Sequence, residues 1–207
     1  MELNPHDLLK IRTIKELISY SSMPGWVTVS LTNAPYVVVR RARAPEGFVA
    51  VGVRGSKRNE RFAAFLPIEH IAERITPEQL ADERGWRERS KEIFHRLEQV
   101  SDLLKKYPYP WGPTGSVGFE LASGKETVTK NSDIDIVIRS PAGLTIEIAK
   151  EMKQELERIP ARLDVQVETV DGAFSLSEYI MSEGKAILFR TMDGPLLKTF
   201  YIPALKK

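Results

Sequence analysis

The stretch GPTGSVGFELASGKETVTKNSDIDIVIRS, residues 112–140, decides how the second half of this chain folds. It starts with a glycine turn at Gly115 and Ser116 and ends in an apolar strand that carries Asp133 and Asp135. Alternate side chains of a strand share a face, so the two carboxylates point the same way, about 7 Å apart along the backbone. Buried carboxylates are costly unless a positive group binds beside them, so this pattern predicts a cation site.

A later stretch, RLDVQVET at residues 162–169, supplies a third carboxylate, Asp164. Its alternation sends the apolar residues to the core and places Asp164 and Gln166 on the opposite face. If the two strands are neighbours, the three carboxylates converge, and two carboxylates about 4 Å apart repel by roughly 4 kcal/mol at an effective dielectric constant of 20. Oxygen ligands of this kind suit Mg²⁺ or Mn²⁺, which commonly bridge to substrate phosphates. We therefore predict that Asp133, Asp135 and Asp164 are metal ligands and catalytic residues.

The glycine turn predicts the phosphate side of the same site. Gly115 and Ser116 open a short helix that we expect to end at Gly124. A turn of this kind presents free backbone N–H groups and the positive end of the helix dipole, and the serine hydroxyl adds a donor. We expect Gly115 and Ser116 to bind phosphate oxygens.

Basic residues add candidate phosphate contacts. The segment VGVRGSKRNERF, residues 51–62, carries Arg54 and Arg58 among its cations, which suit phosphates or an acidic protein but equally suit a solvated loop. Arg139 lies on the same strand face as the aspartates, where it either contacts phosphate or forms a salt bridge.

Composition restricts the class of protein. The chain has 207 residues, 30 basic and 28 acidic, for a net charge of +2, which gives no reason to expect nucleic-acid binding. It contains no cysteine, which excludes disulfides and thiolate chemistry and suits a reducing cytoplasm. It also has no apolar run of about 18 residues that would cross a membrane and no apolar signal segment at its start.

The first half, residues 1–80, is predicted to be a small α/β domain. A short helix is expected at residues 26–32, followed by three strands at 36–42, 48–55 and 61–67 in a mixed or antiparallel layer. A further helix is expected to begin with Thr76 as its N-cap and Pro77 at its first position. Gln79 completes a capping box with Thr76. From Trp86 onward, apolar residues at three- and four-residue spacing predict one long amphipathic helix.

The second half, residues 81–207, alternates in type and predicts a mixed sheet flanked by helices. Strands are expected at 134–139 and 162–169, helices at 144–159 and 174–182, and a hairpin of 186–190 with 196–202. The fold class is therefore α+β, with a domain boundary near residue 80.

These motifs resemble two levels of known family. The glycine turn, Asp-x-Asp and later Asp resemble the nucleotidyltransferase superfamily, although Thr114 stands where an apolar residue is common and the gap to Asp133 is longer than usual. A closer resemblance, to the malonate decarboxylase holo-[acyl-carrier-protein] synthases, or phosphoribosyl-dephospho-CoA transferases, covers nearly the whole chain. It rests on these blocks: PHDLL, APYVVVRRA, VGVRGSKRNERFAAF, PWGPTGSVGFELASG, SDIDIVIR, RLDVQVETVDGAFSLSEY and LFRTMDGPLL.

The closer resemblance implies a defined reaction. The donor is 2'-(5''-triphosphoribosyl)-3'-dephospho-CoA, the acceptor is a serine of the acyl carrier protein subunit of malonate decarboxylase, and pyrophosphate is released. In this reaction Asp133 and Asp135 would hold two metal ions, Asp164 would assist the serine, and Gly115 and Ser116 would hold the departing phosphates.

Two other interpretations remain open from the residues alone. One is a nucleotidyltransferase that acts on a different hydroxyl, because Asp-x-Asp chemistry does not choose the acceptor. The other is a nucleotide-binding module without turnover. Docking of the carrier protein is a hypothesis for residues 1–75.

Overall fold

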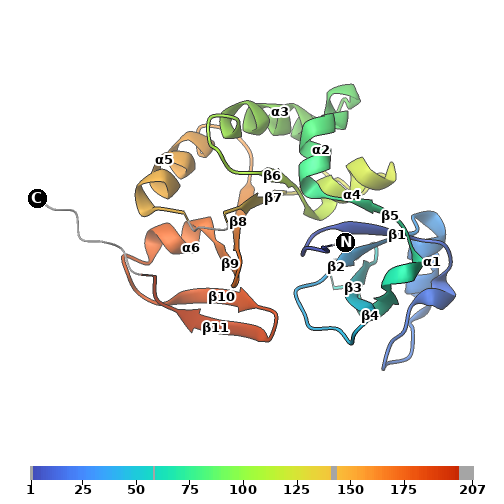
Figure 1. Ribbon diagram of the computed structural model, residues 1–207. Helices are drawn as coiled ribbons and strands as arrows, with labels where there is room; N and C mark the ends of the chain where they lie inside the picture. Colours follow the sequence, from blue (N-terminus) through green and yellow to red (C-terminus); the bar gives the residue numbers. More distant parts are fainter. Residues whose placement is uncertain (1, 58, 141–143, 201–207) are drawn as a thin grey trace, which may run out of the picture.

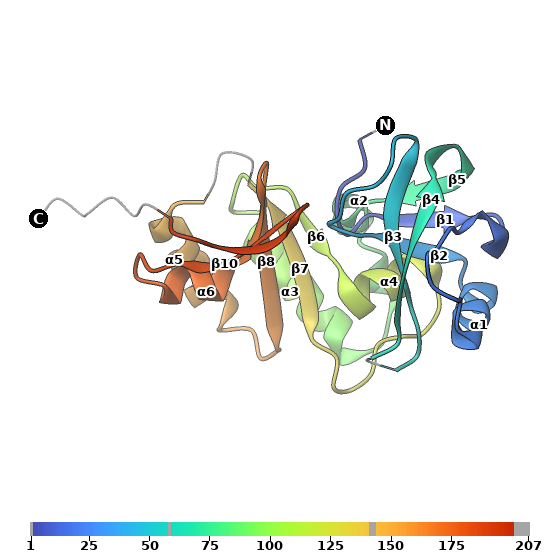
Figure 2. The ribbon, with the colours of Figure 1, turned by 90° about the horizontal axis from the view of Figure 1, so that it is seen from below.

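The computed structural model describes residues 2–57, 59–140 and 144–200, and it arranges them as two β-sheets side by side, each with its own hydrophobic core (Figures 1 and 2). The α+β class is confirmed. Within the described residues, no helix is long and apolar enough to cross a membrane.

The first sheet is antiparallel and has the strand order β4-β3-β2-β1-β5. Its elements are β1 (Leu8–Ile11), η1 (Ile14–Glu16), α1 (Gly25–Asn33), β2 (Tyr36–Val39), β3 (Phe48–Arg54), β4 (Arg61–Pro67), η2 (Ile68–His70) and β5 (Ile71–Ile75). The expected helix and three strands are confirmed, whereas β1 and β5 were not predicted. Both gain their hydrogen bonds from partners distant in sequence, and β1 is only four residues long.

Alternation within this sheet separates a core face from an outer face. Val49, Val51 and Val53 of β3 are buried in the core that α1 covers. Gly52 and Arg54 lie on the opposite, outer face of β3, which faces the second half of the chain. This outer face forms one wall of a cavity between the two halves.

Three helical segments connect the sheets: α2 (Pro77–Glu83), η3 (Gly85–Glu88) and α3 (Glu92–Leu104). The capping box at Thr76 is confirmed, since its hydroxyl accepts a hydrogen bond from the Gln79 N–H at 3.1 Å. The expected single long helix from Trp86 is wrong, because the backbone is extended at Arg89 and Lys91. This break lets Trp86 fold back and donate its indole N–H to Glu98 of α3 at 2.6 Å.

The second sheet is mixed, with the order β11-β10-β9-β8-β7-β6, and only the β7–β8 pair is parallel. Its elements are β6 (Trp111–Pro113), α4 (Gly115–Ser123), β7 (Ile134–Arg139), α5 (Ile146–Leu156), β8 (Leu163–Thr169), β9 (Gly172–Ser175), α6 (Leu176–Met181), β10 (Ile187–Thr191) and β11 (Gly194–Lys198). Helix α5 is the crossover between the parallel strands, as parallel pairing requires. The end of α4 at Gly124 and the β10–β11 hairpin are confirmed, and residues 201–202 of the hairpin prediction lie outside the described residues.

One helix prediction in this half needs correction. Phe174 was expected to begin a helix, but it lies in β9 and pairs with Val167 of β8. The helix begins only after Ser175, whose hydroxyl caps it by accepting from the Glu178 N–H. Phe174 is buried and its ring packs against Tyr179 of α6. This tertiary packing overrides the local preference for helix.

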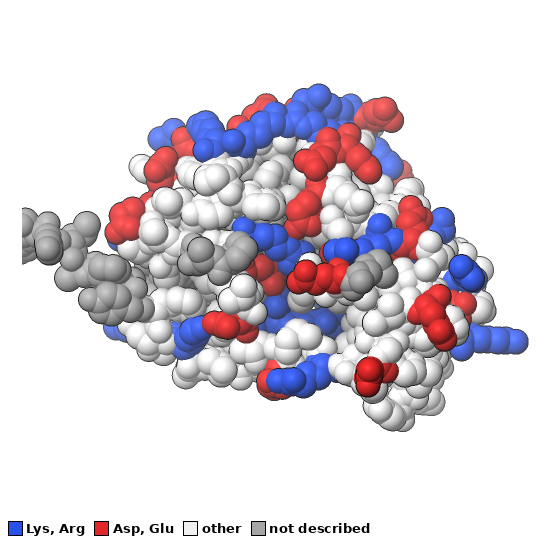
Figure 3. Space-filling model, in the orientation of Figure 1, with Lys and Arg blue, Asp and Glu red and all other residues white. Residues whose placement is uncertain are grey.

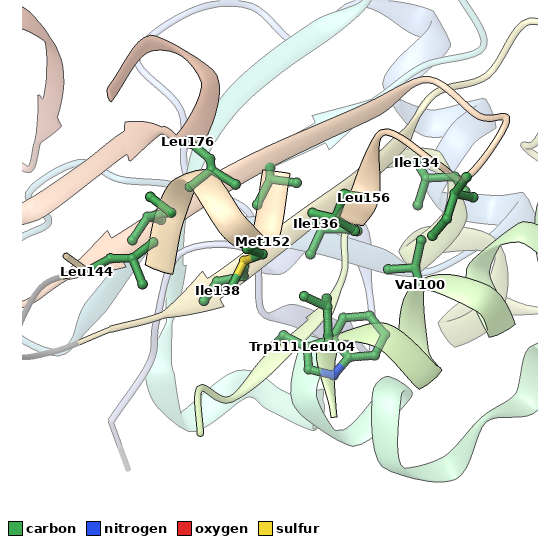
Figure 4. Close-up of a cluster of buried hydrophobic side chains, with 14 of the residues drawn as sticks. Val100, Leu104, Trp111, Ile134, Ile136, Ile138, Leu144, Met152, Leu156 and Leu176 are labelled. Carbon is green, nitrogen blue, oxygen red and sulfur yellow. The ribbon is translucent and has the colours of Figure 1, made fainter. Parts of the chain in front are cut away.

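The helices α3, α5 and α6 cover one face of the second sheet. Ile134, Ile136 and Ile138 of β7 point into this layer, toward Val100 of α3 and Met152 of α5 (Figure 4). All five side chains are buried, so this face of β7 is fixed by apolar burial.

Gly112 tests the close contact between β6 and α2. A Cβ at this position would lie 1.9 Å from the carbonyl oxygen of Pro77, so the strand and helix must separate to admit it. We expect Gly112→Ala to lower the free energy of unfolding by about 1–3 kcal/mol, measured by urea denaturation. Gly85→Ala is the matched control because no atom lies within 4 Å of its Cβ, and equal losses in both variants would contradict the predicted contact.

Candidate active site between the two sheets

A cavity of about 580 Å³ lies where the outer face of the first sheet meets the ends of β7 and β8 and the start of α4. Figure 3 shows basic and acidic side chains together in the middle of the molecule, at this junction. The first half contributes His6, Tyr36, Val38, Arg40, Arg41, Arg54 and Arg61, and the second half contributes Thr114, Gly115, Phe119, Asp135, Asp164, Gln166 and Arg190.

Two of the predicted carboxylates meet in this cavity. Asp135 of β7 and Asp164 of β8 are directly opposite one another in the parallel pair, as the two alternating patterns predicted. Burial raises the pKa of Asp135, and the charge of Asp164 raises it further, while Arg54 opposes the shift. A half-buried carboxyl group that faces a second carboxylate is well suited to hold a cation.

Gly115 is required by the position of Asp135. Its backbone φ is +58°, and a Cβ there would lie 1.7 Å from Oδ2 of Asp135. The preceding Thr114 donates its N–H to the Asp135 carbonyl at 2.8 Å. The glycine turn thus lies directly against the carboxylate, and Thr114 and Gly115 line the cavity.

Asp133 and Ser116 lie differently from the prediction. Asp133 precedes β7 and pairs with Arg162, whose Nε is 2.7 Å from Oδ1, and it does not line the cavity. Ser116 is buried beside the cavity rather than in its wall, and its carbonyl accepts from the Thr127 hydroxyl at 2.8 Å.

Asp135 and Asp164 have the ligand type and the proximity that a divalent metal ion requires. No group of three or more acidic or histidine side chains among the described residues is arranged to hold a metal. Asp135 and Asp164 are nevertheless adjacent oxygen donors, and Mg²⁺ is commonly bound by one or two carboxylates together with water and substrate phosphates. Asp133 would join them only after leaving Arg162.

Of the basic residues predicted to contact phosphate, Arg54 lines the cavity and Arg139 does not. Arg54 lines the cavity within electrostatic reach of Asp135, and Arg58 lies outside the described residues. Arg139 is on the same face of β7 as Asp135 but serves as a salt-bridge partner: its guanidinium contacts Glu78 at 2.8 Å and the Pro5 carbonyl at 3.1 Å.

Glu168 is the centre of the charged contacts that join the two halves. This buried β8 carboxylate pairs with Arg41, lies 3.4 Å from Nε2 of His6, and accepts a hydrogen bond from Gln166 at 2.7 Å. Burial alone would raise the pKa of Glu168, but the hydrogen bond from His6 and the charge of Arg41 outweigh it and hold the pKa below the usual value. The ionised carboxylate therefore holds three residues that line the cavity, Arg41, His6 and Gln166.

Sequence reasoning did not identify Arg40, Arg190 or His6 as parts of the site. Arg40 directly follows β2 and Arg190 lies within β10, and neither belongs to the glycine or aspartate motif, while His6 reaches the cavity from a left-handed backbone conformation with φ of 76°. Strand alternation would have placed Arg40 on the outer face of the first sheet. Only the packing of the two sheets brings that face to the carboxylates.

Comparisons with known proteins give a consistent result. The model described as phosphoribosyl-dephospho-CoA transferase MdcG N-terminal domain matches residues 4–77, and the corresponding C-terminal domain model matches residues 79–199. Proteins named phosphoribosyl-dephospho-CoA transferase are similar over most of their length. One from Pseudomonas fluorescens is 35% identical over 96% of this chain and 94% of its own, and one from Klebsiella pneumoniae is 34% identical over 94% of each. No solved structure matches this chain.

Substitution of Gly115 tests its contact with Asp135. We expect Gly124→Ala to lower the free energy of unfolding by about 1–2 kcal/mol, because both glycines have positive φ. Gly115→Ala should cost about 1–3 kcal/mol more, because its Cβ must displace the Asp135 carboxylate. Urea denaturation measures both losses, and equal values would show that the carboxylate does not rest on the turn.

The raised pKa of Asp135 predicts a stability effect with a definite sign. The folded state favours the protonated carboxyl, so its contribution to stability is present below the ordinary value of 3.8 and is lost as the pH rises through the raised value. Asp135→Asn should therefore melt at a higher temperature than the unmodified protein at about pH 8 in EDTA, with a difference that narrows as the pH falls through the raised pKa toward 3.8.

The exposed Asp82 provides the control for this measurement, since it lies outside the cavity. Asp82→Asn should show no such pH-dependent difference. An Asp135→Asn protein that melts at or below the temperature of the unmodified protein at about pH 8 would contradict the electrostatic account.

Proposed function

The chain belongs to the phosphoribosyl-dephospho-CoA transferase family and is a transferase, and on this premise we propose its donor, its acceptor and its chemistry. The donor is triphosphoribosyl-dephospho-CoA. The acceptor is a serine of the acyl carrier protein subunit of malonate decarboxylase, and pyrophosphate is the second product.

The observation that carries this proposal is the opposed pair Asp135 and Asp164 in a cavity whose other wall is rich in arginine. A phosphorylated donor needs cationic contacts for its oxygens, and the transfer needs a group that stabilises charge at the reacting phosphorus. The cavity contains arginines that could contact the phosphate oxygens and two carboxylates that could hold a charge-stabilising cation. The neighbouring Gly115 turn lets the backbone approach the same point.

The transfer is an in-line displacement at phosphorus. The serine hydroxyl oxygen attacks the phosphorus that is bonded to the ribose oxygen, and a new P–O bond forms while the bond to the bridging oxygen of pyrophosphate breaks. Asp164 accepts the hydroxyl proton, and the electron pair of the broken bond leaves with pyrophosphate. The carrier protein then holds the prosthetic group through a phosphodiester.

Asp135 and Asp164 would hold Mg²⁺ or Mn²⁺, with Asp133 as a further ligand if it leaves Arg162. A divalent ion bound there supplies positive charge to the attacking and leaving oxygens. Asp135, the more buried of the two, positions that charge beside the Gly115 turn.

Intact-mass spectrometry of the apo acyl carrier protein tests the proposal. After incubation with this protein, Mg²⁺ and triphosphoribosyl-dephospho-CoA, the carrier should gain the mass of the phosphoribosyl-dephospho-CoA group. Asp135→Ala should reduce the rate at least about a hundredfold, because it removes a metal-holding carboxylate, and EDTA should have the same effect. Asp82→Ala should keep the rate of the unmodified protein.

A carrier that gains no mass would contradict the assigned acceptor. Pyrophosphate release from ATP with another hydroxyl acceptor would then assign a different nucleotidyl transfer to the same carboxylates. Neither product under any of these conditions would indicate a binding module.

A further inference from the structure

Three arginines of the cavity lie outside the chemical step proposed for Asp135 and Asp164. Arg40 follows β2, Arg61 begins β4, and Arg190 lies in β10, and all three line the cavity that holds Asp135 and Asp164. No acidic side chain in the described parts of the chain forms an ion pair or hydrogen bond with any of them. Arg41 differs, because the buried Glu168 neutralises it.

The register of the first sheet places like charges together. Arg61 is directly opposite Arg54 in the antiparallel β3–β4 pair. Like charges at directly opposite positions repel, and Asp135 offsets part of the charge of Arg54. An anion bound beside Arg61 would lessen the repulsion between the two guanidinium groups.

The path of Arg40 is also specific. Its aliphatic stem crosses Gly52 of β3, where a Cβ would lie 3.3 Å from Cδ of Arg40. A glycine inside a strand often marks the close approach of another group. Gly52 therefore leaves room for the Arg40 side chain to extend over the outer face of the sheet.

The balance of charge favours a polyphosphate. Two carboxylates, Asp135 and Asp164, face the three arginines named above together with Arg54. Arginine presents a planar fork of donors that matches phosphate oxygens in a bidentate manner. The arginines of the cavity therefore suit a ligand with several negative charges better than a ligand with one carboxylate.

We propose that Arg40, Arg61 and Arg190 bind the two terminal phosphates of the donor, which leave as pyrophosphate. This inference rests on the proposed function and extends it, since it makes the first sheet half of the donor site. The carboxylates face the reacting phosphorus from the second sheet, and the arginines hold the leaving group from the first sheet and β10. The first half of the chain then serves donor binding.

Calorimetric titration with inorganic pyrophosphate and Mg²⁺ tests the inference without the carrier protein. Arg40→Gln, Arg61→Gln and Arg190→Gln should each weaken pyrophosphate binding about 10- to 100-fold, as expected for the loss of hydrogen bonds to a charged group. Arg12→Gln is the matched control, because Arg12 is exposed and lies outside the cavity, and it should change the affinity by less than about twofold.

Gly52→Val is a second variant that keeps every charge. Its side chain occupies the path of the Arg40 stem, so it should also weaken pyrophosphate binding, while its melting temperature reports whether the sheet remains folded. Arg61→Lys keeps the charge and removes the fork, and it should retain only part of the affinity.

The outcomes separate this inference from the proposed reaction. Pyrophosphate binding that is absent in the unmodified protein, unaffected by the three glutamine variants, or equally weakened by Arg12→Gln would overturn the arginine site, even if the carrier gains the expected mass. Arginine-dependent pyrophosphate binding in a protein that adds no mass to the carrier would sustain the site and reject the assigned reaction.

Discussion

The alternation of β7 between two different surfaces is the constraint on which the site depends. Its three isoleucines point into the layer formed by α3, α5 and α6, so Asp135 and Arg139 must point toward the first sheet. A shift of one residue would place the carboxylate in the apolar core and the isoleucines in the cavity. Apolar burial on one face thus fixes the chemistry on the other.

The parallel pairing with β8 converts this alternation into a pair of opposed carboxylates. The same strand carries Asp164 into the cavity and, four residues further along, Glu168 into the contact between the halves. A buried charge is tolerated only when partners satisfy it, and Glu168 has Arg41, His6 and Gln166. The contact that joins the halves and the cavity carboxylate Asp164 therefore share one strand and one register.

The cavity contains two electrostatic arrangements of opposite sign. On the second sheet, Asp164 raises the pKa of the half-buried Asp135, and on the first sheet Arg61 stands opposite Arg54. Asp135 offsets part of the charge of Arg54, and ligands of opposite charge would lessen the repulsion that remains on each sheet. A metal ion bound to a polyphosphate would satisfy both sheets, so we expect donor and metal to bind together.

Local periodicity and helix caps account for the elements that could be predicted from the sequence. The alternating strands that carry Asp135 and Asp164, the helix from the Gly115 turn to Gly124 and the capping box at Thr76 all have short-range causes. The family also follows from sequence, because the matched blocks extend over both halves.

The side chains that meet across the cavity could not be predicted from local patterns, because the packing of the two halves brings them together. The ion pair of Asp133 with Arg162, the withdrawal of Arg139 to Glu78, and the approach of Arg40, Arg61 and Arg190 to the carboxylates join residues far apart in the chain. The strand assignments of β1 and Phe174 likewise depend on distant partners. Periodicity specifies the face on which a side chain lies, whereas the packing of one sheet against the other specifies what that face contacts.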